Sequence, residues 1–399
     1  MRVPAHRVTV YRGDYSGAIG EVSDYTSSSV TWQHNGVGTG TLVADEDVEV
    51  PAPVDQLTRN LDQVVPVVVR DAGRLWTGRV AHAEREGRPG RGTVTATLVE
   101  DWAWLRAILA WPVPGAAISA QTSVYDTRTG PVETAVKGYL SAAITRLRLP
   151  CAVVPAPPAG TDTSPSDYPV PTARFTPMDE LLLPMLAATG RRLTARLWLP
   201  GDQPIPGLTL TSWTIVFGVE VIPRAAHVIW SDELGIVTRR VATTSPSAVR
   251  AVVGMKGEEL ERLFTEVVNT PLAALLGAAA FPEVMVEATD LDNVADGQAR
   301  GLAKLREDYG PKAAVSFEVA DGAPYTLGSD YDVGSLVRAR TGGVLLEDVC
   351  TRATSTDSAS EGHRITPQIG ATNATETTEE LLVAQVAQLV AAIAASRRR

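Results

Sequence analysis

Histidines are the side chains of this chain best suited to bind a metal or move a proton, and they are few. The five are His6, His34, His82, His227 and His363. No two of them have the sequence spacing of a metal-binding pair. The chain also lacks the G-x-S-x-G, H-E-x-x-H and P-loop motifs of catalytic and nucleotide sites. The sequence therefore predicts no catalytic residue, no metal ligand and no cofactor.

Two other patterns resemble ligand sites but differ in detail. The glycine-rich run 36–40 leads into the strand-like run 41–43, whereas a nucleotide-binding loop leads into a helix. Asp290, Asp292 and Asp296 resemble a calcium loop, but the third acid is displaced and the closing glutamate is missing. These acids are more typical of a helix start, where they interact favourably with the helix dipole.

Carboxylate pairs could serve a cell-wall hydrolase, which needs one acid of raised pKa in a cleft. Glu258–Glu259 and Glu379–Glu380 are typical of charged surfaces, and Glu100–Asp101 stands beside the tryptophan-containing run 102–104. The eight tryptophans are spread over three regions, which favours core packing over a carbohydrate platform. A hydrolase and a glycan- or receptor-binding protein stay open as alternatives.

Composition narrows the class of protein further. The 399 residues, 44% of them hydrophobic, are enough for two or three domains with cores. The net charge of −10 is opposite in sign to that of a typical nucleic-acid binder, so no stable nucleic-acid binding is expected. Cys151 and Cys350 are far apart and form neither a disulfide framework nor a zinc motif.

Membrane contact is not expected either. The longest apolar runs, 271–281 and 381–395, are shorter than the about 20 residues that span a bilayer. The run 271–281 could touch a membrane, but an ordinary buried helix or loop is favoured. The N-terminus has no apolar run behind a basic start, so no signal peptide is predicted.

Short strands and then helices must position these side chains. Strands with turn residues between them fill the first 110 residues and suggest a small barrel or sandwich, with Pro66 marking an edge or bulged strand. Gly130-Pro131 starts a helix, and a second runs from Thr176 as N-cap, with Pro184 inside it. Strands return from Leu208. They are followed by a helix over 290–308 and strands at 315–319 and 363–370.

The segment 325–349 is the most distinctive in the chain. It contains a structural turn motif in which two glycines bracket acidic residues. The motif residues are Gly328, Asp330, Tyr331, Asp332 and Gly334. The run 336–340 then has the pattern of a strand, and Thr341-Gly342-Gly343 turns the chain back into 344–349. This is the turn chemistry of a β-hairpin.

The C-terminus has the pattern of an amphipathic helix. Thr377 and Glu380 form a capping box, and acids at the start and arginines at the end suit the helix dipole. Apolar residues spaced four, three and four apart form a stripe of about two heptads. The stripe consists of Leu382, Val386, Leu389 and Ile393. It predicts a helical contact, either with copies of the chain or with the next protein; packing on its own chain is the alternative.

The segment 325–337 resembles the Y-G-x-D-Y-D-x-G-D-x-V signature of siphovirus tail-hub proteins, the ReqiPepy-type minor tail proteins of actinobacterial phages. Ser335 stands where that family usually has an acid. The strand 76–80 and the segment 129–140 also resemble family segments, in the same order along the chain.

The resemblance implies an α+β fold with two tube-like β-barrels and an α/β domain between them. The first barrel is expected at 1–112, and the α/β decoration domain at 113–204. The second barrel is expected at 205–375, with a helical insertion at about 255–310. The amphipathic helix completes the chain at 376–399.

The resemblance also implies a function. Three chains, each with two barrels, would form a hub at the tail tip of the virion and adapt a sixfold tail tube to a threefold tip. The expected partners are two further copies of the chain, the distal tail protein or tail tube, the tape measure, and tip or fibre proteins. DNA would pass through the lumen without stable binding, because acids repel phosphates. Assembly would take place in the cytoplasm of the bacterial host.

Overall fold

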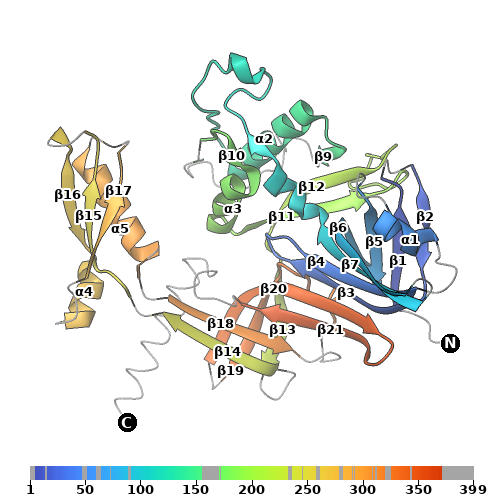
Figure 1. Ribbon diagram of the computed structural model, residues 1–399. Helices are drawn as coiled ribbons and strands as arrows, with labels where there is room; N and C mark the ends of the chain where they lie inside the picture. The colour runs from blue at the N-terminus through green and yellow to red at the C-terminus, as the bar shows by residue number, and fades with distance from the viewer. Residues whose placement is uncertain are drawn as a thin grey trace, which may run out of the picture. The chain divides into compact units, whose positions relative to one another are not determined.

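The computed structural model describes residues 5–370 apart from short internal gaps. The gaps are 14–15, 47–51, 60–63, 72, 89–90, 155–169, 171, 232–235, 245, 258–260, 278–281, 290, 292, 308, 311, 320–324 and 342–343. The chain folds into two compact units (Figure 1). The first unit spans residues 1–238 and 318–369, and the described part of the second spans 239–317.

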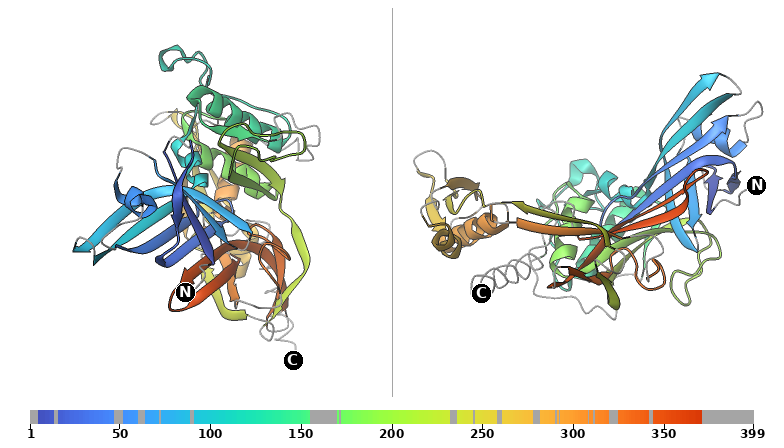
Figure 2. Two further views of the ribbon diagram at one scale, coloured as in Figure 1. Left: turned by 90° about the vertical axis from the view of Figure 1, so that its right-hand side faces the viewer. Right: turned by 90° about the horizontal axis from the view of Figure 1, so that it is seen from below.

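A large sheet in the first unit joins strands from the N-terminal part of the chain to the last described strands. Part of its order is β2-β1-β5-β6-β7-β4-β3-β20-β21. The N-terminal elements are β1 (His6–Tyr11), β2 (Ala18–Val22), β3 (Tyr25–Gln33), β4 (Thr39–Glu46), α1 (Ala52–Arg59), β5 (Pro66–Asp71), β6 (Arg74–Arg88) and β7 (Arg91–Glu100). The blue and cyan strands lie beside the red strands β20 (Val344–Ser358) and β21 (Gly362–Ile369) in Figures 1 and 2. β3 and β20 are antiparallel, with Val30 opposite Ser355.

The sequence pattern explains this sheet except at one strand. Along β3, buried residues such as Val30 and Trp32 alternate with more exposed ones, as in a strand with one face on the core. Pro66 opens β5, which pairs with both β1 and β6 without a bulge. The prediction of an edge or bulged strand at Pro66 is therefore wrong. The first residue of a strand tolerates proline because its missing N–H is not needed by the ladder.

The predicted hairpin is confirmed. β19 (Leu336–Thr341) and β20 pair antiparallel, with Thr341 opposite Val344. β19 also pairs in parallel with β13 (Arg224–Ser231). The neighbouring strands β14 (Ile236–Thr244) and β18 (Lys312–Val319) carry the chain out of the first unit and back. The last predicted strand is confirmed as β21.

A smaller sheet with two helices completes the first unit. Its strand order is β11-β12-β9. The elements are η1 (Asp101–Ala107), β8 (Leu109–Ala110), η2 (Ile118–Ala120), α2 (Val132–Leu147), β9 (Cys151–Val153), β10 (Thr176–Pro177), α3 (Met178–Ala188), β11 (Arg191–Trp198) and β12 (Thr214–Val221). Both helices pack on this sheet around one apolar core, which includes Trp102, Leu140, Leu182 and Phe217.

Two helix predictions are confirmed, and one cap is wrong. α2 begins directly after Pro131, and α3 carries Pro184 in its interior. Thr176 is not the N-cap of α3 but lies in the short strand β10, which pairs with β8. The N–H of the preceding Phe175 donates to Ala110 O (2.7 Å). Pairing with a distant strand thus decides the conformation at this position.

The second unit contains a three-stranded sheet of order β16-β15-β17. Its elements are β15 (Arg250–Gly254), β16 (Phe264–Val268), α4 (Thr270–Leu276), β17 (Glu283–Glu287) and α5 (Val294–Glu307). α5 confirms the helix predicted over 290–308 and buries Leu305. A Cβ on Gly301 would lie only 2.6 Å from Val253, so glycine allows the helix to approach the sheet closely.

The fold is of the predicted α+β class, with mostly strands and few helices. The C-terminal helix predicted at 376–399 lies outside the described residues. None of the described helices is long and apolar enough to cross a membrane.

Candidate functional site

The motif bracketed by Gly328 and Gly334 forms a tight loop before β19. These glycines have φ angles of +94° and +85°, a region that residues with a Cβ rarely adopt. The Gly328 N–H donates to Tyr331 O (2.7 Å), and the Thr326 N–H donates to Asp330 Oδ2 (2.7 Å). The loop is therefore closed by its own backbone and by its first acid.

Asp332 and Ser335 hold the second half of this loop. Asp332 Oδ1 lies 2.8 Å from Arg74 Nη2, and the Arg74 guanidinium lies over the Trp32 ring, 4.6 Å from its centroid. The Asp332 N–H donates to Ser335 Oγ (2.9 Å). Ser335 stands where the tail-hub signature has an acid. Because a hydroxyl oxygen accepts a hydrogen bond as a carboxylate oxygen does, the serine supports the same turn.

Aromatic packing ties the loop to a third strand. Tyr331 is buried and packs edge-on against Trp230 of β13, with 5.8 Å between ring centroids. Tyr325 packs on the same indole at 4.9 Å. The loop thus contacts β6 through Arg74 and β13 through Trp230. The loop therefore forms a joint between strands that are distant in sequence, and its side chains pack against other residues of the same chain.

The carboxylate pair at Glu100 and Asp101 lies in surroundings that perturb acids. Glu100 Oε2 accepts a hydrogen bond from the Gly38 N–H (2.8 Å). Desolvation raises the pKa of Glu100 to about 8 and also raises the pKa of the buried Asp101. A carboxyl group of raised pKa can donate a proton near neutral pH. A surface pocket in the described part of the chain is lined by other residues, including Cys151 and Trp213.

The glycine-rich run 36–40 serves this packing. A Cβ on Gly38 would lie 2.0 Å from Thr31 O and 2.5 Å from Glu100 Oε2. Only glycine fits there, because backbone and carboxylate leave no room for a side chain. The run leads into β4, as the sequence predicted, and not into a phosphate-binding helix.

The two cysteines are free thiols. Burial raises the pKa of Cys151 and of Cys350 to about 12. Because the thiolate is the nucleophile, a raised pKa disfavours the reactive form of both side chains at neutral pH.

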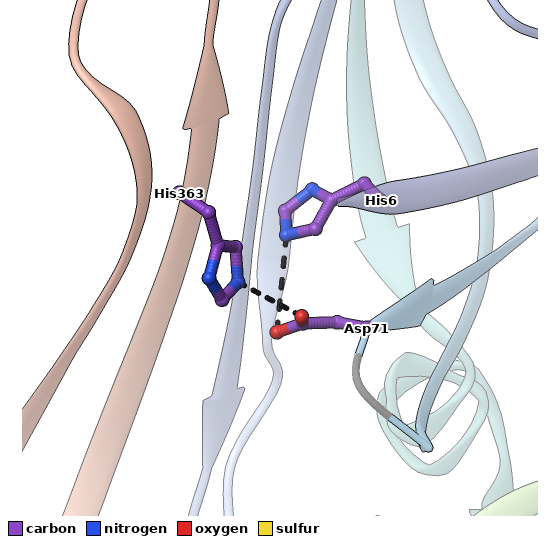
Figure 3. Close-up of side chains that lie close together, drawn as sticks. All are labelled: His6, Asp71 and His363. Atoms are coloured by element: carbon purple, nitrogen blue, oxygen red, sulfur yellow. Dashed lines mark ion pairs between the residues drawn. The ribbon is translucent and has the colours of Figure 1, made fainter. Parts of the chain in front are cut away.

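The fold brings together two histidines that are far apart in sequence. His6 begins β1, Asp71 ends β5, and His363 lies near the start of β21. Figure 3 shows both rings beside the Asp71 carboxylate. His363 Nε2 lies 2.8 Å from Asp71 Oδ1, and His6 Nε2 lies 3.9 Å from Asp71 Oδ2. Spacing along the sequence could not reveal this cluster, because strand pairing alone makes its three members neighbours.

The histidines differ in pKa and in exposure. Burial lowers the pKa of His6 in this cluster to about 4, with Asp71 opposing the shift. Burial, together with Arg192, lowers the pKa of His34 to about 4. His82 and His227 are exposed, and His227 Nε2 lies 3.9 Å from Asp330 Oδ1.

Several residues singled out in the sequence lie outside the described part of the chain. They are Asp290, Asp292, the pairs at 258–259 and 379–380, and the stripe of Leu382, Val386, Leu389 and Ile393. The contact expected of the stripe stays a prediction.

Solved phage tail proteins have a similar fold. A 43 kDa tail protein of prophage MuSo2 from Shewanella oneidensis matches with a TM-score of 0.54 at 12% identity, over 94% of this chain and 99% of that one. A tail protein from Neisseria meningitidis matches with a TM-score of 0.50 at 12% identity, over 92% and 97%. At this identity the comparisons show a shared fold.

The siphovirus ReqiPepy6 Gp37-like family matches residues 7–371. Because the match covers nearly the whole length, the chain belongs to this family. The resemblance seen in the 325–337 signature is thereby confirmed. No curated protein sequence matches the chain.

Proposed function

We propose that this chain is a structural hub of the phage tail tip. The observation that carries the proposal is the family match over residues 7–371, joined to a fold shared with a phage tail protein over nearly the full length of both chains. The contacts of the 328–334 motif also support a structural role, because its side chains bind other parts of the same chain. The protein would act in the virion after assembly in the host cytoplasm.

The proposed architecture is two tube-like β modules in each chain. Residues 1–112 would supply one module, and 205–375 the other, with an insertion at about 255–310. Residues 113–204 would form the outer decoration. The pairing of β3 with β20 supports a close union of the two modules, because it makes one sheet of strands from both.

The proposed assembly is a ring of three chains. Three chains with two modules each present six similar units, so they can meet a sixfold tail tube on one side and a threefold tip on the other. Head-to-tail contacts between identical chains close into rings when the rotation permits. The stripe Leu382, Val386, Leu389 and Ile393 would add a helical contact within the ring or with the next tail protein.

The net charge of −10 supports a lumen that DNA traverses without binding. Like charges repel, and neutralisation of phosphates is the main source of nonspecific DNA affinity. Purified assemblies should therefore retain no duplex DNA on a gel-filtration column at low salt. Co-elution of DNA with the protein would contradict a passive lumen.

The mass of the purified chain in solution tests the hub directly. We expect a species of three times the 42.3 kDa chain mass, and imaging of tail tips should show a threefold ring at the end of the tube. A chain that stays monomeric at all concentrations, and is absent from purified virions, would contradict the proposal.

The hydrolase alternative rests on one observation, the raised pKa of Glu100. A zymogram on host cell walls separates it from the hub. Clearing that disappears in Glu100→Gln but persists in Glu84→Gln would favour the enzyme. The exposed Glu84 is a matched control on the adjacent strand β6. A glycan array would in the same way reveal a receptor-binding role through a saturable ligand.

A further inference from the structure

His6, Asp71 and His363 form a cluster of metal-ligand side chains in the first unit (Figure 3). Each offers one nitrogen or oxygen atom, and these atoms lie within 4.8 Å of one another. His6 and Asp71 are fully buried, whereas the His363 side chain is 28% exposed. His363 is therefore the member of the cluster nearest to solvent.

The ligand atoms surround one point. Ser355 Oγ, on β20, lies 2.8 Å from His6 Nε2 and 3.3 Å from His363 Nε2. The same hydroxyl donates to Asp71 Oδ2 (2.7 Å). Two imidazole nitrogens and one carboxylate oxygen thus converge on a single small atom. The three side chains come from separate strands, and a cation held by them would take the position that the Ser355 hydroxyl occupies here.

Asp71 keeps an unused acceptor in this cluster. Its Oδ1 receives no hydrogen bond from the described residues, although it is buried. The His363 Nε2 atom lies 2.8 Å from this oxygen as an ion-pair partner and 3.3 Å from Ser355 Oγ. A buried carboxylate oxygen without a donor costs free energy, and a cation would offset that cost.

The surroundings fix the histidine that is most deeply buried. His6 Nδ1 lies 2.9 Å from Ser28 Oγ, so the serine can orient the ring while Nε2 faces the cluster. Metal-binding histidines typically have such a partner on their second nitrogen. The Ala5 N–H donates to Asp357 Oδ2 (2.8 Å), and this carboxylate also accepts from Tyr25 Oη, which anchors the chain next to His6.

We propose that His6 Nε2, Asp71 and His363 Nε2 bind one divalent transition-metal ion of the zinc class. Two imidazoles and one carboxylate suit Zn²⁺ or Co²⁺, whereas Ca²⁺ and Mg²⁺ select sites built of oxygen atoms. The three atoms must close to separations on the order of 3.5 Å, which follows from metal–ligand distances of about 2.0–2.2 Å. A water, or Ser355 Oγ after rotation of its side chain away from the centre, would complete the coordination.

The ion would act as a structural cross-link. It joins β1 and β5 to β21, and therefore ties the N-terminal strands to the last described strand of the chain. Metal bound only to the folded state stabilises that state. This role is independent of the proposed tail function, because it concerns the sheet of a single chain.

The test uses the full chain, purified without a histidine tag and stripped with a chelator. The stripped protein is equilibrated with Zn²⁺ or Co²⁺, and bound metal is measured by inductively coupled plasma mass spectrometry. We expect one ion per chain, a visible Co²⁺ spectrum typical of four-coordinate nitrogen and oxygen ligation, and a higher Tm. Because the protein carries no histidine tag and no residual nickel, the measured number of ions per chain reports binding by the chain itself.

Variants separate the cluster from other histidines. His363→Ala, at the partly exposed ligand, should keep the fold and weaken Zn²⁺ binding at least tenfold; Asp71→Asn should do the same if it folds. His82→Ala removes an exposed histidine and should change neither Zn²⁺ binding nor Tm. Failure of the wild-type chain to bind an ion, or equal binding by His363→Ala, would overturn the proposal. A lower Tm of His363→Ala in a comparison where the wild-type chain takes up no metal would also overturn it, and the cluster would then stabilise the sheet by hydrogen bonds alone.

Discussion

Gly38 illustrates how one residue is fixed by packing. The backbone of β3 and the Glu100 carboxylate leave no space for a Cβ, and the Gly38 N–H is the donor that Glu100 uses. Ser335 is a second example. Its hydroxyl oxygen accepts the hydrogen bond from the Asp332 N–H at a position where the family signature has an acid. At this scale, polar groups and glycines serve the architecture of the chain.

Gly38→Ala should destabilise the fold. The new methyl group would meet Thr31 O and force the strand to shift, and overpacking of this kind costs about 1–3 kcal/mol. Urea denaturation would show a lower free energy of unfolding. Gly115→Ala is the matched control, because a Cβ there would have no neighbour within 4 Å. Equal stability of the two variants would contradict the close approach.

Glu100→Gln should flatten the dependence of stability on pH. The folded pKa of about 8 lies above the ordinary value of 4.5, so the folded state holds a proton that the unfolded state releases. Stability from Glu100 is therefore fully present below pH 4.5 and is lost as the pH rises through 8. Thermal melts between pH 5 and about 9 should show a smaller decline in the variant. An identical decline in both proteins would count against a protonated Glu100.

The loop before β19 shows how an element can join distant strands. It contacts β6 through Arg74 and β13 through Trp230, while β19 pairs with β13 and β20. Its glycines close the loop locally, and its acid and aromatic side chains bind elements from both halves of the chain.

Arg74→Ala should weaken this joint. The variant loses the Asp332 ion pair and the contact with Trp32, and both partners are shielded from solvent in part. We expect a loss of about 1–2 kcal/mol in the free energy of unfolding. Arg7→Ala removes an exposed pair with Glu21 and should change stability little. A similar small effect in both variants would mean that the joint contributes nothing.

At the scale of the whole molecule, one sheet unites the N-terminal strands with the last described strands of the chain. β3 pairs with β20, and the cluster of His6, Asp71 and His363 lies across the same union. A module closed in this way suits a part that must hold its shape within a larger assembly. In the proposed ring, contacts between copies would use surfaces outside this sheet, and the C-terminal stripe stays a prediction.

Leu389→Asp should weaken assembly and leave the fold intact. A charge in the middle of the apolar stripe cannot be buried against a partner helix without a large desolvation cost. Native mass measurements should show a shift from the assembled to the monomeric form, with an unchanged circular dichroism spectrum. Gln388→Asp places the same charge beside the stripe and should assemble normally. Equal assembly of both variants would mean that the stripe packs on its own chain.

Local patterns in the sequence predicted the elements whose chemistry is local. The hairpin after Ser335 was predictable because its turn residues adjoin it, and the helices α2 and α5 because their apolar residues repeat along one face. The bounds of other elements could not be predicted in this way. The strand predicted from Leu208 begins at Thr214, since pairing with β9 and β11 sets where it starts.

The sequence by itself determined the turn motif and the helices α2 and α5, because turn chemistry and periodicity act between residues close in the chain. Its signature segments identified the family, and the resemblance implied the α+β class. Only the tertiary structure decided that β3 pairs with β20, that Pro66 lies in an interior strand, and that His6 meets Asp71 and His363. Many strands have compatible alternation. Burial of a shared core, which no short segment encodes, selects which of them become neighbours.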